Sequence, residues 1–385
     1  MPETIIAFVN WLSAPVPITT FSIILFFVVM YFYRTITKPK VDLGIFAVVL
    51  GIFGAFCMEP WFYKQVTKPR HVPAVAIIFL MGFFGWLAMR QAAINDEYIE
   101  QGMEIPERAE AEKEVLTWPD LVFTEFISTL FVSVILMVWA LTLSAPLEEP
   151  ASATTSPNPA KAPWYFLGLQ ELLVYFDPWI AGVIIPTLII VGLMAIPYID
   201  RNPKGSGYYT YTQRPFAVTT YMFGWYILWI LLVFRGTFLR GPNWAHFGLF
   251  EKWDTAKATA SVNITFSDII WVDILNMTPP EISGTNVFGL FTIPSDIWLG
   301  IMTLPIDPFV REFPGFIVLG LYFIVPTIVL AKTWWRDLYI KLGLIRYSIL
   351  SFLMLTFVAI PLKMYLRWIF SLKYIVEIQS LYLNI

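Results

Sequence analysis

Residues 179–199, WIAGVIIPTLIIVGLMAIPYI, contain no charged side chain and match the length of about 20 residues that an α-helix needs to cross the apolar core of a bilayer. Charged residues make up 14% of the whole chain, against roughly 25% in soluble domains. Similar apolar runs recur at 17–33, 43–58, 73–89, 121–143, 216–234, 315–331 and 345–362. The sequence therefore predicts an all-α integral membrane protein with about eight transmembrane helices and a long extramembrane loop.

Charge and cysteine content exclude several classes of protein. The net charge is −3 and the basic residues are scattered singly, so no nucleic-acid-binding surface is expected. The single cysteine, Cys57, excludes disulfides, thiolate metal sites and covalent haem attachment, and we interpret it as a buried apolar residue. The first residues lack a basic stretch followed by a short apolar run and a cleavage site, so we expect the N-terminus to be retained.

The basic loops predict an orientation in the membrane. Three of them lie on one side if the eight spans alternate, and the positive-inside rule makes that side cytoplasmic. These loops are RTITKPKVD at 34–42, DRNPKGSGYYTYTQRP at 200–215 and AKTWWRDLYIKLG at 331–343. Lys64, Lys68 and Arg70 on the opposite side argue against this orientation. We expect both termini outside the cytoplasm, in a bacterial-type energy-transducing inner membrane.

Two long connections are rich in aromatic residues and are expected on the outer side. Residues 144–178 begin as a Pro-, Ser- and Thr-rich stretch and then become aromatic and amphipathic. Residues 239–312 form the longest connection, with Trp and Phe throughout. Loops of this length are usually functional or disordered, and their aromatic content argues against disorder. We expect them to pack against each other or against a partner at the membrane surface.

The chain has few residues that could hold a metal or a haem. It contains two histidines, His71 and His246, whereas a pair of b-type haems between helices needs about four axial histidines. Both lie outside the apolar runs, and we interpret them as polar loop residues rather than ligands. There is no Gly-rich phosphate loop, His-Glu-x-x-His or Gly-x-Ser-x-Gly motif, so hydrolase, kinase and metalloprotease activities have no support.

Residues 119–240 resemble the C-terminal half of cytochrome b, which is called subunit IV where it is a separate chain, in quinol-oxidising Rieske/cytochrome b complexes. An ordered set of motifs carries the resemblance: WPDLVF at 118–123, LEEPA at 147–151, APWYF at 162–166, GLMAIPYIDRNP at 192–203 and QRPFAVTTYMFG at 213–224. We expect residues 315–331 to continue it as the family's further C-terminal helix. Residues 1–92 and the last span have no counterpart that we can place in the family.

The resemblance and the spans together suggest five regions. These are an N-terminal three-helix membrane extension at 1–92, a cytoplasmic linker at 93–118, the subunit IV-like domain at 119–240, an outer-face loop region at 241–312 and C-terminal transmembrane helices at 313–385.

The resemblance implies a quinol-oxidation site on the outer face. The family carries Pro-Glu-Trp-Tyr there, and the acidic residue accepts a proton from quinol. The matching positions in this sequence are Ala162, Pro163, Trp164 and Tyr165, so the acid is missing. Quinol oxidation needs a proton acceptor within hydrogen-bond reach, and the nearest carboxylates are Glu171 and Asp177.

Each residue of this predicted site has a plainer interpretation. Pro163, Trp164, Tyr165 and Phe166 are predicted to contact the quinol ring, although Trp and Tyr also serve as ordinary interface anchors. Glu171 and Asp177 are the candidate catalytic residues, and the plainer alternative for Glu171 is a solvated or interfacial carboxylate on the polar face of a surface helix.

Other charged residues suggest further roles. Arg201, Lys204 and Arg214 resemble the border of the family's second quinone site, the quinone-reduction site, although basic residues there also serve as topology signals. Glu125 lies one turn inside an apolar span, where an ionisable group is functional by default unless its side chain reaches the membrane surface.

The sequence thus predicts a membrane subunit of a quinol:cytochrome c oxidoreductase-type complex that supports electron transfer coupled to proton translocation. The isolated chain is expected to have no activity and to bind no cofactor or metal, with quinol as the substrate. Expected partners are a haem-carrying cytochrome b N-terminal subunit, a Rieske iron–sulfur protein and c-type cytochromes with haem c, in a dimeric complex. The alternatives are a structural or assembly subunit without quinol chemistry, or a transporter. The sequence favours a transporter less. Transporters are expected to carry charged residues near broken helices in the membrane, whereas Pro186 and Pro326 interrupt spans with no charged residue beside them.

Overall fold

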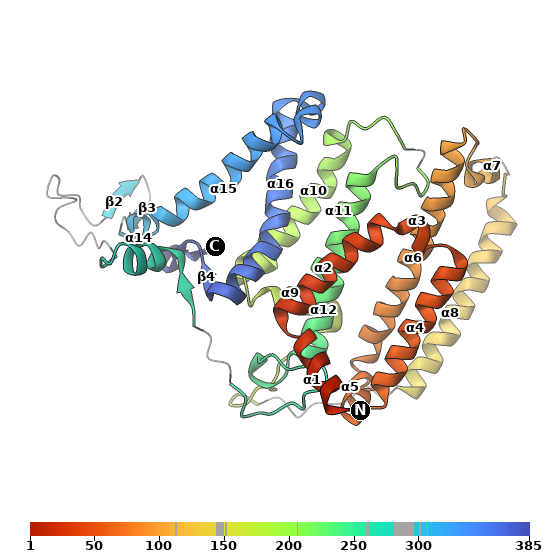
Figure 1. Cartoon of the computed structure of the whole chain (residues 1–385), viewed down its shortest axis with the longest axis horizontal. Coiled ribbons are helices and arrows are strands. Elements are labelled where there is room, and N and C mark those ends of the chain that lie inside the picture. The colour runs from red at the N-terminus through yellow and green to blue at the C-terminus, as the bar shows by residue number, and fades with distance from the viewer. Residues whose placement is uncertain are drawn as a thin grey trace. The chain divides into compact units, whose positions relative to one another are not determined.

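The computed structural model describes residues 1–111, 114–143, 150, 152–205, 207–258, 262–279, 296–299, 302–305 and 307–385 (Figure 1). The chain divides into two compact units. The first comprises Met1–Gly168 and Asn202–Ala258, and the second comprises Leu169–Arg201 and Thr259–Ile385. Each unit is described by itself.

The predicted transmembrane helices are present. Seven helices of the described residues are long and apolar enough to cross a membrane, and α1 with α2, bent by 76°, makes an eighth candidate. The seven are Pro39–Cys57, Val72–Glu100, Thr117–Thr142, Ile180–Ile199, Pro215–Leu239, Phe313–Lys332 and Arg336–Phe370. Each overlaps one of the predicted apolar runs, and the run at 17–33 overlaps α2. The prediction of an all-α membrane protein is confirmed.

The first unit is built from helices. Its elements are α1 Glu3–Leu12, α2 Pro15–Tyr31, α3 Tyr33–Ile36, α4 Pro39–Cys57, α5 Pro60–Val66, α6 Val72–Glu100, α7 Pro106–Ala111, η1 Thr117–Leu121, α8 Val122–Thr142, η2 Trp164–Phe166, α11 Pro215–Trp225, η4 Tyr226–Ile230, α12 Leu231–Phe234, η5 Arg235–Leu239 and η6 Pro242–Trp244. Helix α9, Leu167–Leu172, contains the boundary between the units.

One apolar core joins the N-terminal helices to the helix that ends at Leu239. Phe26 and Met30 of α2 pack with Met89 of α6 and with Ile227 and Leu231. A second core gathers Phe62, Val66, Phe238, Leu239 and Phe250 at the other end of these helices. Cys57, which was expected to be buried, is half-buried beside this second core.

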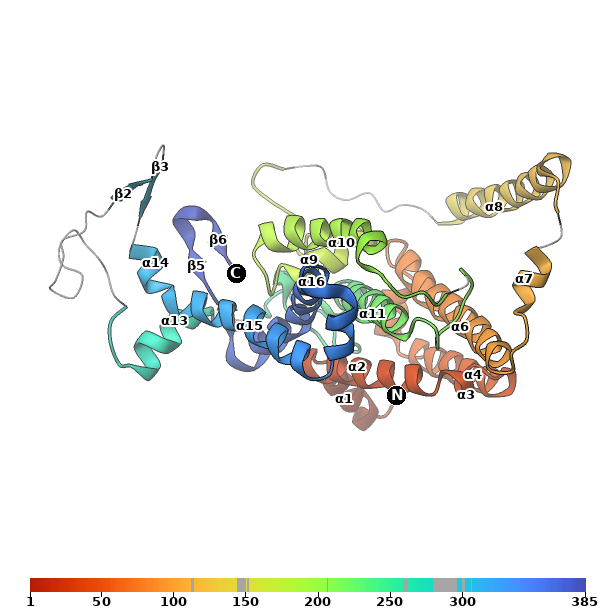
Figure 2. The same ribbon diagram turned by 90° about the horizontal axis from the view of Figure 1, so that it is seen from above.

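Helix α8 stands apart from the rest of its unit. Every residue from Glu114 to Thr142 is exposed, and Figure 2 shows α8 away from α4 and α6. An apolar helix that its own chain does not cover must be covered by lipid or by another polypeptide.

The second unit contains the remaining helices and several short strands. Its elements are α9, η3 Ile180–Ile184, α10 Ile185–Ile199, β1 Ile264–Thr265, α13 Phe266–Asp268, η7 Ile269–Ile274, β2 Asp296–Leu299, β3 Met302–Pro305, α14 Asp307–Arg311, α15 Phe313–Lys332, α16 Arg336–Phe370, β4 Leu372–Tyr374, β5 Glu377–Ile378, η8 Gln379–Leu381 and β6 Leu383–Asn384.

Hydrogen bonds between side chains and backbone fasten α15 to α16, which lie next to each other in Figure 1. Tyr322 Oη donates to the carbonyl of Leu355 at 2.7 Å, and Tyr347 Oη donates to that of Thr327 at 2.8 Å. Gly343 interrupts α16 with φ of +74°, a left-handed conformation that glycine adopts without steric cost. The apolar part of α16 therefore begins after a separate first turn.

The last residues are not helical. Strand β4 pairs in parallel with β1, and β5 pairs antiparallel with β6. The sequence predicted only transmembrane helices for 313–385, and these short pairings were missed because two or three residues carry no periodic apolar pattern.

Candidate functional site

The predicted quinol-contacting residues form an exposed aromatic turn in the first unit. Phe166 N donates to the carbonyl of Pro163 at 2.9 Å, which closes the short helix η2. The ring centroids of Trp164 and Tyr165 are 5.5 Å apart, and those of Tyr165 and Phe166 are 4.8 Å apart. Tyr165 and Phe166 are 47% and 53% exposed. Such a surface could contact a flat apolar ring.

The long helix Pro215–Leu239 holds this turn in place. Lys161 Nζ donates to the carbonyl of Thr237 at 2.8 Å. A Cβ at Gly236 would lie 3.3 Å from the carbonyl oxygen of Leu167, so any larger residue would require the turn to shift by a few tenths of an ångström. A Cβ at Gly168 would contact Val233 and Trp229 at ordinary distances. The turn is thus anchored on both sides of its aromatic residues.

Two lysines approach one tryptophan near the turn. The Nζ atoms of Lys161 and Lys68 lie 4.6 and 4.8 Å from the ring centroid of Trp253. Both distances are typical of cation–π contacts. Burial, together with the charges of Arg70 and Lys64, lowers the pKa of Lys68 to about 8.

His71 lies buried in the same region. Its side chain is 2% exposed, its Nδ1 lies 2.8 Å from the carbonyl oxygen of Gln65, and its ring packs edge-on against Phe238. Burial lowers the pKa of His71 to about 3, so the imidazole is neutral and Nδ1 is the donor. His246 lies in the loop after η6 and pairs with Arg240 in an isolated β-bridge. Within the described residues, no three His, Cys, Asp or Glu side chains are grouped to hold a metal ion.

Glu171 is fully buried in the second unit. It accepts a hydrogen bond from Tyr175 Oη at 3.1 Å, and Tyr175 packs edge-on against Trp368 with ring centroids 5.6 Å apart. This burial contradicts the solvated form of the alternative interpretation of Glu171. A buried carboxylate next to a phenol hydroxyl can accept, hold and release a proton.

Asp177, the second candidate, is half-buried and forms a hydrogen bond with a residue near the C-terminus. Its Oδ2 accepts a hydrogen bond from Asn384 Nδ2 at 2.8 Å. Lys373 Nζ donates to the carbonyls of Leu173 and Val174, each at 3.1 Å, and so binds the turn that follows α9. These contacts join the segment 171–177 to the strands that follow α16.

Lys363 is a buried lysine that the sequence did not reveal. It is 3% exposed, and its Nζ has no hydrogen-bond partner among the described residues and lies 5.9 Å from the ring centroid of Phe176. Its sequence signal is a single lysine at the end of an apolar run, which equally suits a side chain that reaches the membrane surface.

The residues predicted to border a second quinone site lie in or directly before the loop that precedes α11. Arg214 Nη2 donates to the carbonyl of Asn202 at 3.2 Å, and its Nε would lie 2.6 Å from a Cβ at Gly205. Lys204 is exposed in this loop, and Arg201 is exposed in the other unit. A hollow of about 590 Å³ lies beside the loop and is lined by Tyr211, Thr212 and Pro215 but not by Arg214 or Lys204.

Glu125 lies on the exposed helix α8. Its carbonyl accepts a hydrogen bond from Thr129 Oγ1 at 2.8 Å. The motif LEEPA at 147–151, apart from Pro150, lies outside the described residues.

Residues 150–245 match the family model for the C-terminal part of cytochrome b, b6 and petD. The match covers about a quarter of the chain and includes the Trp164 turn, Glu171, Asp177 and the loop of Arg214. It confirms the resemblance found in the sequence, although residues 119–149 lie outside it. No solved structure matches the chain. The family fits a cytochrome b-type subunit of a quinol oxidoreductase complex.

Proposed function

We propose that this chain, which carries a cytochrome b C-terminal segment at residues 150–245, is a membrane subunit of a quinol-oxidising complex in an energy-transducing inner membrane. It supplies part of the outer quinol site, with the Trp164 turn on the outer face. Trp164, Tyr165 and Phe166 contact the quinol ring, and Pro163 sets the start of the turn.

Glu171 accepts a proton from quinol in place of the acid that the Trp164 turn lacks. The observation that carries this proposal is its complete burial with Tyr175 inside the matched segment. Asp177 is less suited, because Asn384 already binds its carboxylate. Oxidation of quinol to quinone releases two protons and two electrons. Glu171 takes one proton and passes it to the outer side, the other proton goes to water on the same side, and the two electrons leave to groups on partner subunits.

The partners follow from the same proposal. A haem-carrying cytochrome b subunit receives one electron, and a Rieske iron–sulfur protein receives the other and passes it to c-type cytochromes. Arg201, Lys204 and Arg214 border a second quinone site on the cytoplasmic side. The complex is a dimer, and its turnover moves protons across the membrane.

Separate Glu171→Gln and Asp177→Asn variants of the purified complex test the proton acceptor. We expect quinol-oxidation turnover to fall by about 10²-fold or more in Glu171→Gln, the usual contribution of a general base, and by less than about threefold in Asp177→Asn. Thermal unfolding and subunit composition establish that each variant still assembles. Unchanged turnover in both variants would favour a structural subunit without quinol chemistry.

A second measurement tests where the cofactors lie. The purified isolated chain is expected to show no haem absorbance, whereas the intact complex shows it. Haem absorbance that copurifies with the isolated chain would contradict the assignment of the haems to partner subunits.

A further inference from the structure

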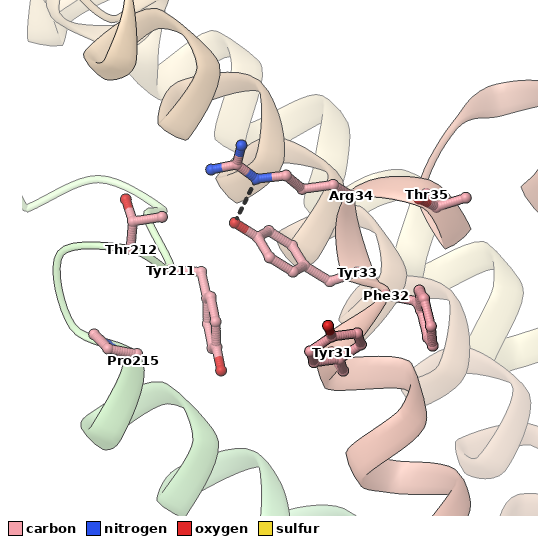
Figure 3. A pocket seen from close by; sticks show the side chains of 8 residues that line it. All are labelled: Tyr31, Phe32, Tyr33, Arg34, Thr35, Tyr211, Thr212 and Pro215. Carbon is pink, nitrogen blue, oxygen red and sulfur yellow. Dashed lines mark hydrogen bonds between the residues drawn. The ribbon is translucent and has the colours of Figure 1, made fainter.

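Two adjoining hollows form one groove in the first unit. The first, of about 590 Å³, lies between α3 and the loop before α11 and is lined by Tyr31, Phe32, Tyr33, Arg34 and Tyr211, among others (Figure 3). The second, of about 570 Å³, shares Tyr31, Phe32 and Tyr211 with the first. It continues along the apolar side chains of α2. The groove therefore has a polar, aromatic end and an apolar end.

A buried carboxylate fixes the polar end. Asp96 is fully buried and accepts hydrogen bonds from Tyr33 Oη at 2.8 Å, Tyr211 N at 3.2 Å and Thr212 Oγ1 at 2.7 Å. The rings of Tyr33 and Tyr211 lie 4.8 Å apart. The two walls are therefore held together by the protein itself, and the groove is formed in advance of any ligand.

One ion pair supplies the charge at this end. Arg34 Nη1 donates to Glu100 Oε2 at 3.0 Å, and Arg34 Nε donates to Tyr33 Oη at 3.0 Å, the bond drawn in Figure 3. The Arg34 and Glu100 side chains are 35% and 52% exposed. Exposed ion pairs usually contribute little to stability, but Arg34 Nη2 also donates to Glu100 Oε1, so this pair is bidentate and among the stronger of its kind. A ligand that displaces either partner must therefore replace the lost contact. A ligand with both charges can satisfy Arg34 and Glu100 together.

The aromatic residues favour the positive part of such a ligand. Tyr31 is 79% exposed and Phe32 is 50% exposed, and their ring centroids lie 4.8 Å apart. Aromatic faces attract ammonium groups, and a guanidinium binds phosphate oxygens through charge-assisted hydrogen bonds. Glu100 would repel a ligand that carries only negative charge. An uncharged aromatic ligand would gain nothing from the charges of Arg34 and Glu100.

The apolar end suits a hydrocarbon chain. Ile24, Phe27 and Val28 of α2 line it and are 58%, 50% and 44% exposed. These residues belong to an apolar helix that is expected to lie in the membrane, and tyrosines such as Tyr31 prefer the membrane surface.

We propose that this groove binds a phospholipid with a zwitterionic ethanolamine or choline headgroup. The phosphate lies on Arg34, beside the Glu100 carboxylate that Arg34 also binds, the ammonium group lies against Tyr31, and one acyl chain follows α2. The lipid links α2 and α3, which lie outside the segment matched to cytochrome b, to α11 within it. The site is independent of quinol oxidation.

Native mass spectrometry of the full delipidated chain tests the site with three added probes. These are phosphatidylethanolamine, phosphatidylglycerol with the same acyl chains, and decylubiquinone. We expect phosphatidylethanolamine to bind about tenfold more tightly than phosphatidylglycerol, and decylubiquinone not to displace it. Tighter binding of phosphatidylglycerol, or displacement by the quinone, would overturn the proposal in favour of an anionic lipid or a quinone.

Two variants locate the bound lipid. Arg34→Gln and Tyr31→Leu are each expected to weaken phosphatidylethanolamine binding by about threefold to tenfold, because each removes one polar or cation–π contact. Lys40→Gln removes a positive charge a few residues away, outside the groove, and should bind as the wild type does. Tyr31 is so exposed that its replacement leaves folding intact. Wild-type binding by the Tyr31→Leu variant would overturn the proposed position.

Discussion

Tyr175 donates its hydroxyl hydrogen to Glu171 one helical turn earlier, at 3.1 Å, and both side chains are fully buried. The phenol therefore fixes the orientation of the carboxylate that we propose as the proton acceptor. Removing the donor leaves a buried carboxylate oxygen with one hydrogen bond fewer, which is unfavourable for the charged form.

We therefore expect Tyr175→Phe to lower quinol-oxidation kcat by about fivefold to tenfold, while KM changes by less than about twofold. Steady-state kinetics of the purified complex at several quinol concentrations separates the two parameters. Tyr382→Phe is the matched control, because Tyr382 is 82% exposed in the same unit. Equal kinetics for the wild type and Tyr175→Phe would remove Tyr175 from the proposed mechanism.

Asp96 should be essential for the stability of the first unit. It is fully buried and accepts hydrogen bonds from Tyr33, Tyr211 and Thr212. In Asp96→Asn one carboxylate oxygen becomes an amide nitrogen, which cannot accept hydrogen bonds from these donors. We therefore expect a loss of about 2–4 kcal/mol in unfolding free energy. Thermal unfolding in detergent measures it. The neighbouring Glu97 is exposed, and Glu97→Gln should stay within about 0.5 kcal/mol of the wild type. Similar stabilities for the two variants would contradict the role of Asp96.

Gly236 should be required for the position of the Trp164 turn. A methyl group at Gly236 would lie 3.3 Å from the backbone oxygen of Leu167 and 3.4 Å from its Cβ, which is too close without movement of the turn. Gly236→Ala is expected to cost about 1–2 kcal/mol of stability and to lower quinol oxidation. Gly82→Ala serves as the control, since nothing lies within 4 Å of the added methyl group. A fully active Gly236→Ala complex would show that the turn tolerates this movement.

His71 should make the stability of the chain depend on pH. Its pKa falls from 6.5 to about 3 on folding because the ring is buried. The unfolded chain thus binds a proton that the folded chain rejects, so the stabilisation is complete above pH 6.5 and is lost as the pH falls toward 3. The loss approaches about 1.4 kcal/mol per pH unit in this window.

His71→Gln tests this dependence. Glutamine can still donate to the carbonyl of Gln65, but it does not titrate in this range. We expect the stability of the wild type to fall by about 2 kcal/mol more than that of the variant between pH 6.5 and 5. Unfolding of the two proteins in detergent at both pH values gives the difference. Parallel pH profiles would show that His71 is exposed or protonated in the folded protein.

The transmembrane helices were predictable because a bilayer imposes a length and a polarity on each span. Residues 179–199 illustrate this, since the observed span is Ile180–Ile199. The extension of α6 to Glu100 was not predictable from hydropathy. It depends on Asp96, which is buried by a loop more than a hundred residues later in the sequence, through Tyr211 and Thr212.

The candidate site was only partly predictable for the same reason. The family motifs identified Trp164 and Tyr165, and the missing acid directed attention to Glu171. Glu171 is hydrogen-bonded by Tyr175, four residues later, and Tyr175 packs on Trp368, which no local pattern connects to this segment. Lys363 was missed because its burial comes from tertiary packing, including Phe176, rather than from its neighbours in sequence.

Helix α8 has a consequence for how the protein could be divided. Every residue from Glu114 to Thr142 is exposed, so the described part of the link between α7 and α8 makes no packing contact that a cut before α8 would remove. Two polypeptides, one ending after α7 and one beginning before α8, should reassemble when they are coexpressed. The covalent link at that point then fixes a one-to-one ratio of the two parts and is not needed for their assembly.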